Sequence, residues 1–409
     1  MNDPSNNKKN VIGIIIVAAL GYFVDVYDLI LFSVVRKPSL VSLGITGDHQ
    51  IDVGVMLLNW QMAGMLIGGI LWGVLGDKKG RISVLFGSIF LYSAANIANG
   101  FVQDVPTYAM LRFIAGIGLA GELGAGITLV SEIMPKESRG WGTTIVATVG
   151  LLGAVVAALI ANKFDWRVSY FLGGAMGLAL LILRISVYES GMYKNIKDKN
   201  VSKGNFIKLF TNKERFFKFS KCILIGLPTW FVVGVLVTFS DKFAEAFGLN
   251  VPINPAQSIM YTYIGIVIGD FVSGYMSQMM KSRKKVVLIF LFMNFICITI
   301  YLYFNHFGST FFYFMCGALG FANGYWAVFV TNASEQFGTN YRATVTTAVP
   351  NIIRGTTVPM TLSFQFFREY LGIVNGAVIV AVIALAIAVI ATVRMEETFG
   401  KDLDYVEVT

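Results

Sequence analysis

Residues 131–144, SEIMPKESRGWGTT, and residues 334–347, SEQFGTNYRATVTT, show the same pattern in the two halves of the chain. Both stretches follow an apolar run, and Gly121 and Gly324 precede them at matching positions. Matches at one constant offset favour an internal duplication over chance. The matched residues are Ser131, Glu132, Arg139, Thr143 and Thr144 in the first half and Ser334, Glu335, Arg342, Thr346 and Thr347 in the second.

The chain as a whole is apolar enough to belong in a membrane. Of its 409 residues, 56% are hydrophobic and 14% are charged, and the mean hydropathy is +0.68, whereas a soluble domain has about 25% charged residues. The net charge of +8 is spread between apolar runs, which excludes a nucleic-acid partner and leaves the lipid bilayer as the surroundings. The three cysteines and two histidines form no ligand cluster, so we expect no metal or other cofactor.

Apolar runs of about 20 residues each predict twelve membrane-spanning helices. The first run is too long for a signal peptide, and we interpret it as a retained helix. The first six helices are expected near residues 11–35, 51–75, 82–101, 105–130, 141–161 and 168–188. The second six are expected near residues 219–240, 258–279, 286–304, 309–332, 345–367 and 373–394.

One long polar stretch, residues 191–218, separates the two sets and predicts a cytoplasmic linker. The expected organisation is an amino-terminal bundle, residues 1–190, and a carboxy-terminal bundle, residues 219–409, which ends in a short cytoplasmic tail. Segments on the amino-terminal side of the membrane carry about 23 Lys and Arg residues and those on the opposite side about 6, which places both termini in the cytoplasm. We therefore expect a multi-pass protein of the plasma membrane, the inner membrane in a bacterium.

The loop between the second and third spans reads GVLGDKKGR, residues 73–81. Gly73 permits close helix approach, and Asp77 can accept hydrogen bonds at a helix amino terminus, although an ordinary basic turn has a similar composition. The nonapeptide resembles the signature loop of the major facilitator superfamily, G-x-x-x-D-x-x-G-R/K. RFIAGIGLAGELG, residues 112–124, and PKESRG, residues 135–140, are similar to the fourth-helix motif and the following loop of the same superfamily.

This resemblance implies a transporter, not an enzyme, that works as a monomer with two pseudo-symmetric six-helix bundles and no cofactor. It also implies a charge network that closes the cytoplasmic side, although surface ion pairs worth about 0 to 1 kcal/mol each are the alternative. The corresponding second-half loop departs from the pattern because Gln278 replaces the aspartate. The residues implied in the network are Asp77, Arg81, Glu132, Arg139, Glu335 and Arg342.

Asp25 and Asp28 lie in the first apolar run, GYFVDVYDLILF. Three residues apart, they share one helix face near the bilayer centre, where each costs on the order of 2.5 to 3.5 kcal/mol. Two close carboxylates in a low dielectric do not both ionise cheaply, so at least one is expected to bind a proton near neutral pH. Arg112 and Glu122 of the fourth span are expected to assist, and a structural ion pair between the aspartates and Arg112 is the alternative. The acidic pair and GLAGELG together resemble the metabolite:proton and sialate:proton symporter branches.

Arg354 is the expected contact for an anionic substrate, because its planar guanidinium can hold a carboxylate through two hydrogen bonds. The alternative is a permanent pair with Asp270. Aromatic residues in such helices are more often packing or interface residues, and Asn323 could instead bridge two helices. The other residues expected at the substrate site are Asn323, Gln61, Trp60, Tyr261, Asp270 and Trp326, with Trp230, Tyr263 and Tyr325 as further candidates.

These features together predict alternating-access, proton-coupled uptake of a small organic anion such as a carboxylate metabolite. The proton is the expected coupling ion. A carrier for a sugar, an amino acid or another neutral or zwitterionic compound is an alternative, as is an exporter. A non-transporting membrane receptor is a more remote one.

Overall fold

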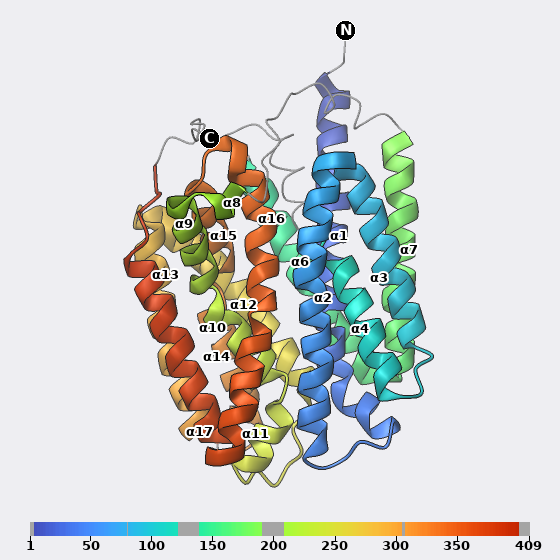
Figure 1. The fold of residues 1–409 in the computed structure, drawn as a ribbon, viewed down its shortest axis with the longest axis vertical. Coiled ribbons are helices and arrows are strands. Elements are labelled where there is room, and N and C mark those ends of the chain that lie inside the picture. The colour runs from blue at the N-terminus through green and yellow to red at the C-terminus, as the bar shows by residue number, and fades with distance from the viewer. Residues whose placement is uncertain (1–3, 80, 122–138, 190–207, 305–306, 401–409) are drawn as a thin grey trace.

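The computed structural model describes residues 4–79, 81–121, 139–189, 208–304 and 307–400. Within these ranges the chain forms helices that run roughly parallel to the long axis (Figure 1). Helices up to α7 lie in one group, and those from α8 onward lie in a second group beside it (Figure 1). The all-α architecture expected from the sequence is confirmed.

The first bundle follows the expected spans closely. Asp104 caps the helix of the fourth span, and its side chain accepts a hydrogen bond from the Thr107 N–H at 2.8 Å. Residues 122–138, which follow that helix, lie outside the described ranges. The helices are α1 (Pro4–Ser42), α2 (His49–Lys79), α3 (Arg81–Asn99), α4 (Val105–Leu119), α6 (Arg139–Lys163) and α7 (Trp166–Glu189).

The second bundle opens with a span that is interrupted more than once. Its segments are α9 (Lys213–Ile225), α10 (Leu227–Phe231), the π-helical turn η2 (Val232–Val237) and α11 (Ser240–Ala246), preceded by the short α8 (Lys208–Thr211). A π-helical turn widens the helix by one residue, and such turns occur often at functional sites. The sequence predicted one continuous helix near residues 219–240.

The tenth span is also broken, between α14 (Ser309–Asn323) and α15 (Trp326–Glu335). Two long helices, α12 (Pro255–Met279) and α13 (Arg283–Tyr303), precede it. The chain ends with α16 (Thr339–Gly355) and α17 (Thr357–Val393), and α17 reverses direction at Gly372, where φ is 78°. The part of α17 before that glycine completes the eleventh span, and the part after it is the twelfth.

Among the described residues, nine stretches are long and apolar enough to cross a membrane. One of them, Ala348–Val393, contains the reversal at Gly372, so it includes two crossings. With the shorter α4 and with α3, the helices are consistent with the twelve crossings predicted. The start of α1 and the end of α17 lie at the same end of the molecule (Figure 1). We call this the terminal end and the opposite one the far end.

Glycines allow corresponding helix pairs in the two halves to touch backbone to backbone. In the first bundle, a Cβ atom added to Gly116 of α4 would lie 2.1 Å from the carbonyl oxygen of Gln61 on α2. In the second bundle, a Cβ atom added to Gly320 of α14 would lie 1.9 Å from the carbonyl oxygen of Thr262 on α12. The shared close crossing agrees with the internal duplication seen in the sequence.

The close crossing in the second bundle predicts a large effect of Gly320→Ala. The added methyl group has no space beside the Thr262 carbonyl, and overpacking of this kind costs about 1 to 3 kcal/mol. We expect a clear drop in the Tm of the purified protein in detergent. Gly274→Ala in α12 is the matched control, because no atom lies within 4 Å of its added Cβ. Equal Tm changes for the two variants would contradict the close packing.

Candidate functional site

The two bundles meet along a seam. On the first bundle it is formed by α1, α2 and α6, and on the second by α12, α16 and α17 together with η2 and α11. A small cavity of about 40 Å³ lies in this seam, about halfway along α1. It has room for little more than a water molecule. We call it the central cavity, and its aromatic and charged lining residues are Tyr22, Trp230, Tyr263, Trp326 and Arg354.

An ion pair joins the bundles at the central cavity. Nη2 of Arg354 on α16 lies 3.8 Å from Oδ2 of Asp25 on α1, and the two side chains are 2% and 0% exposed. Nη1 of Arg354 donates to Oδ1 of Asn351 at 3.4 Å. The guanidinium is therefore held between the halves of the molecule by a carboxylate from the opposite half.

Asp270 is not the ion-pair partner of Arg354 in the structure. Its Oδ1 accepts a hydrogen bond from the backbone N–H of Ala327 at 3.0 Å, at the start of α15. A carboxylate is stabilised there because the first N–H groups of a helix lack helical partners. Asp270 is thus engaged at the break between α14 and α15, which the sequence did not reveal.

Asp28 points into the first bundle, although Asp25 faces the seam. It interacts electrostatically with Arg112 and with Asp25. Gly173 of α7 leaves the necessary space, since an added Cβ would lie 2.4 Å from Oδ1 of Asp28. Arg112 in turn donates from Nη1 to the hydroxyl of Tyr170 at 3.2 Å. Helix positions three apart differ by about 60° in direction, which is enough to give neighbouring carboxylates different partners.

Trp60 and Tyr261 do not reach the central cavity, contrary to expectation. Trp60 is 46% exposed and packs its ring against Phe113, and Tyr261 is 41% exposed and packs against Tyr313. Both lie on the outer surface of their bundles. Tyr263, two residues farther along α12, faces the cavity instead, because successive helix positions turn by about 100°.

Gln61 and Asn323 are buried but act within their own bundles. The Gln61 side chain donates to the carbonyl oxygen of Leu29 on α1 at 3.0 Å. Asn323 accepts a hydrogen bond from Asn294 of α13 at 2.8 Å. The position of Asn323 favours the helix-bridging alternative. Trp326, by contrast, lines the central cavity as expected.

Within the expected charge network, the structure describes the side chain of Glu335. Its carboxylate accepts a hydrogen bond from Thr398 at 2.7 Å and lies 3.4 Å from Nη2 of Arg283. The other residues of the network lie in undescribed segments or have side chains outside the described set, and the same holds for Glu122 of the fourth span. The network residues concerned are Asp77, Arg81, Glu132, Arg139 and Arg342.

Glu397 links the segment after α17 to the start of α13 by hydrogen bonds at the terminal end. It accepts hydrogen bonds from the Ser282 hydroxyl and, at 2.9 Å, from the Arg283 N–H. Partial burial opposes its ionisation, but these hydrogen bonds and those from neighbouring N–H groups outweigh the burial and hold the pKa of Glu397 below its usual range. This segment also carries Thr398 to Glu335.

Two residues at the far end were missed by the sequence reasoning. Arg36, near the end of α1, forms a buried ion pair with Asp241 of α11. A basic residue at the end of an apolar run ordinarily indicates an interface anchor, and nothing in the sequence links it to an aspartate in the other half. Tyr22 of the central cavity was missed as well.

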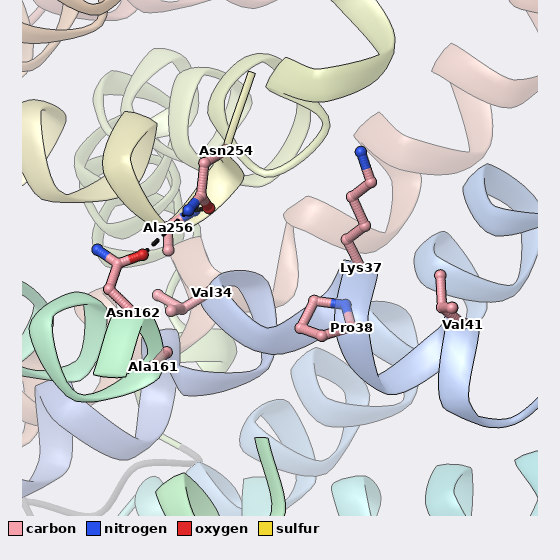
Figure 2. A pocket seen from close by; sticks show the side chains of 8 residues that line it. All are labelled: Val34, Lys37, Pro38, Val41, Ala161, Asn162, Asn254 and Ala256. Atoms are coloured by element: carbon pink, nitrogen blue, oxygen red, sulfur yellow. Dashed lines mark hydrogen bonds between the residues drawn. The ribbon is translucent and has the colours of Figure 1, made fainter. Parts of the chain in front are cut away.

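A larger cavity of about 380 Å³ is lined by the last turns of α1 (Figure 2). Its walls come from α1, from the end of α6 and from the start of α12, so it opens at the seam. Asn254 donates to Asn162 across it at 3.0 Å (Figure 2). Lys37 also borders it.

Metal ligands do not gather in the part of the chain that the structure describes, where no group of three or more His, Cys, Asp or Glu side chains could hold an ion. Cys222, Cys297 and Cys316 are free thiols.

Comparison with known proteins agrees with this architecture. A probable 4-methylmuconolactone transporter of Cupriavidus pinatubonensis is 24% identical over 93% of this chain and 89% of its own length. The sialic acid transporter NanX of Escherichia coli is 26% identical over 66% of each chain. The structure of the proton:xylose symporter XylE matches with a TM-score of 0.71 and 15% identity, covering 97% of this chain and 98% of that one.

The XylE match shows the fold alone. Residues 18–355 match the Major Facilitator Superfamily, so the match spans most of the chain and both bundles. The resemblance seen in the sequence motifs is thereby confirmed, and the chain is a multi-pass membrane transporter and not an enzyme. The protein belongs to the Major Facilitator Superfamily.

Proposed function

We propose that the protein takes up a small organic anion together with protons, by alternating access. The observation that supports this most directly is the buried pair between Asp25 and Arg354, which places a cation and a proton-accepting group from opposite bundles at one cavity. The positive-inside pattern places the terminal end in the cytoplasm, and in a bacterium the membrane is the inner one. The far end then faces outside.

Arg354 has spare capacity for an anion. Its Nε has no hydrogen-bond partner among the described residues, and its contacts through Nη1 and Nη2 are long. A substrate carboxylate can therefore take two hydrogen bonds from the guanidinium and displace Asp25. An anion is favoured over a neutral sugar because a buried cation gains most from a charged partner.

Displacement of Asp25 couples the anion to a proton. Once Arg354 turns to the substrate, the fully buried Asp25 carboxylate loses its counter-charge, and a proton restores neutrality. Anion and proton thus bind together better than either does alone, a coupling of about 1 to 3 kcal/mol. One proton accompanies each carboxylate charge.

The walls of the central cavity favour a flat, unsaturated carboxylate. Tyr22, Trp230, Tyr263 and Trp326 offer ring faces and edges around Arg354. The cavity in the present conformer is smaller than the roughly 300 to 1,000 Å³ of a typical ligand site, so the bundles must separate to admit substrate. The relatives named for 4-methylmuconolactone and sialic acid transport support an organic acid.

A panel of ligands tests the substrate class first. Benzoate, nicotinate, sialic acid, xylose and an amino acid would each be added to the purified protein, and Tm would be recorded. A bound ligand stabilises the native state by about 2.7 kcal/mol at one hundred times its Kd. We expect the acids, and the flat ones most, to raise Tm. A rise with xylose alone would contradict the proposal.

Uptake into proteoliposomes then tests the coupling. For a monocarboxylate, one proton per anion predicts accumulation driven by an inward proton gradient. We expect an imposed membrane potential at equal pH to drive no accumulation, because no net charge moves. Accumulation that follows the potential and ignores pH would contradict the exchange at Asp25.

A further inference from the structure

At the far end of the seam, Arg36 of α1 forms an ion pair with Asp241 of α11. The two side chains are 0% and 1% exposed, and they belong to opposite bundles. Neither residue lines the central cavity. The contact therefore needs a role separate from binding substrate.

The surroundings of Arg36 are shaped for a guanidinium. Its Nε donates to the carbonyl oxygen of Thr238 at 3.2 Å, and its guanidinium carbon lies 4.6 Å from the centre of the Phe239 ring. Gly54 of α2 leaves room for both, since an added Cβ would lie 3.0 Å from Cδ of Arg36 and 3.1 Å from the Phe239 ring. A carboxylate, a carbonyl group and a ring face surround one buried cation.

The pair is connected to the wall of the central cavity through η2. The N–H of Thr238 bonds to the carbonyl oxygen of Val233 at 3.2 Å, and Val233 lines that cavity. The Thr238 hydroxyl lies 2.7 Å from the same carbonyl oxygen and 3.0 Å from the hydroxyl of Ser33 on α1. One wide turn thus separates the cavity from the contacts that bridge the bundles.

We propose that Arg36 and Asp241 form an outer latch that must break whenever the far end of the seam opens. Its strength sets the fraction of empty carriers that are closed at this end. That the latch lies on the outer side of the membrane rests on the proposed function, which assigns the far end to the outside. The latch itself follows from the buried contact.

A second ion pair at the same end provides a matched control. Arg368 of α17 lies 2.7 Å from Asp52 of α2 and also joins the bundles, but the two side chains are 15% and 46% exposed. Solvent screens such a pair, which contributes about 0 to 1 kcal/mol. Loss of one partner from the buried pair instead leaves an uncompensated charge, which costs far more while the seam stays closed.

The test measures how often the seam opens. Leu58 of α2 is 1% exposed and lies about one helical turn deeper than Gly54, so Leu58→Cys reports opening past the latch. Cys222, Cys297 and Cys316 would be replaced by alanine to remove competing thiols. The rate of labelling by a water-soluble maleimide is then measured in detergent without substrate, for Arg36→Gln, Asp241→Asn, the double variant and Asp52→Asn.

We expect each single latch variant to label at least about tenfold faster and the double variant no faster than the faster single, because the two side chains act as one pair. Asp52→Asn should change the rate less than about threefold. Unchanged labelling in the single variants would overturn the proposal, and so would a double-variant effect equal to the product of the single effects. Labelling is measured well below the Tm of every variant, so that unfolding does not contribute to the rate. Because the readout needs neither substrate nor a proton gradient, failure of the proposed function would leave it unaffected.

Discussion

Asp25→Asn is expected to abolish proton-driven accumulation while leaving exchange of substrate across the membrane intact. Asparagine fills the same space but can neither neutralise Arg354 nor carry a proton, so the anion binds without one. Accumulation in proteoliposomes with an inward proton gradient should fall to the equilibrium level. Counterflow of labelled substrate should continue, and its apparent KM should lose its dependence on pH.

Asp48→Asn at the far end is the matched control for this change, because Asp48 is exposed and does not line the central cavity. It should accumulate substrate as the parent does. If Asp25→Asn drives accumulation at the parental level, the coupling site lies elsewhere. Asp28 would then be the next candidate, since it interacts with both Asp25 and Arg112.

Arg354→Lys is expected to raise the KM for the anion by about 10 to 100-fold. Lysine retains the charge but loses the planar fork that holds both oxygens of a carboxylate. Its ammonium group also has different geometry toward Asp25 and Asn351. Initial rates of uptake over a range of substrate concentrations would give KM and maximal rate separately.

Arg368→Lys provides the comparison, because Arg368 is another arginine of the same half that pairs with an aspartate across the seam, yet outside the central cavity. Its KM should stay within about twofold of the parental value, as expected for a half-exposed pair. If the KM of Arg354→Lys equals the parental value, Arg354 does not bind the substrate and its role is structural.

The number and placement of the crossings could be predicted from the sequence because a bilayer requires runs of apolar residues of fixed length. Breaks within a run were not predictable in the same way. The interruption around η2 falls in the apolar run Val232–Val237, and the one between Asn323 and Trp326 contains only Gly324 and Tyr325, so neither is long enough to interrupt an apolar run of about 20 residues. What changes at a break is the pattern of backbone hydrogen bonds, and that pattern depends on neighbouring helices. On α12, for example, Asp270 accepts a hydrogen bond from the Ala327 N–H at the start of α15.

The candidate site shows a similar division. The depth of Asp25, Asp28, Arg112 and Arg354 follows from position along a helix, and these residues are buried as expected. The direction of each side chain depends on how its helix is rotated against the others. For this reason the partner of Arg354 was left open between substrate and Asp270, and the structure gives it Asp25. The latch residues Arg36 and Asp241 could not be paired from sequence, because contact between two bundle ends is a tertiary property.

The bridge between Asp25 and Arg354 also bears on energy conservation in the cell. A membrane protein that let hydrogen ions through unaccompanied would discharge the gradient that drives ATP synthesis. In the empty carrier, Asp25 is already balanced by Arg354, so a lone hydrogen ion would leave a buried positive charge behind. Under the proposed coupling, the empty carrier would therefore not conduct protons across the membrane without substrate.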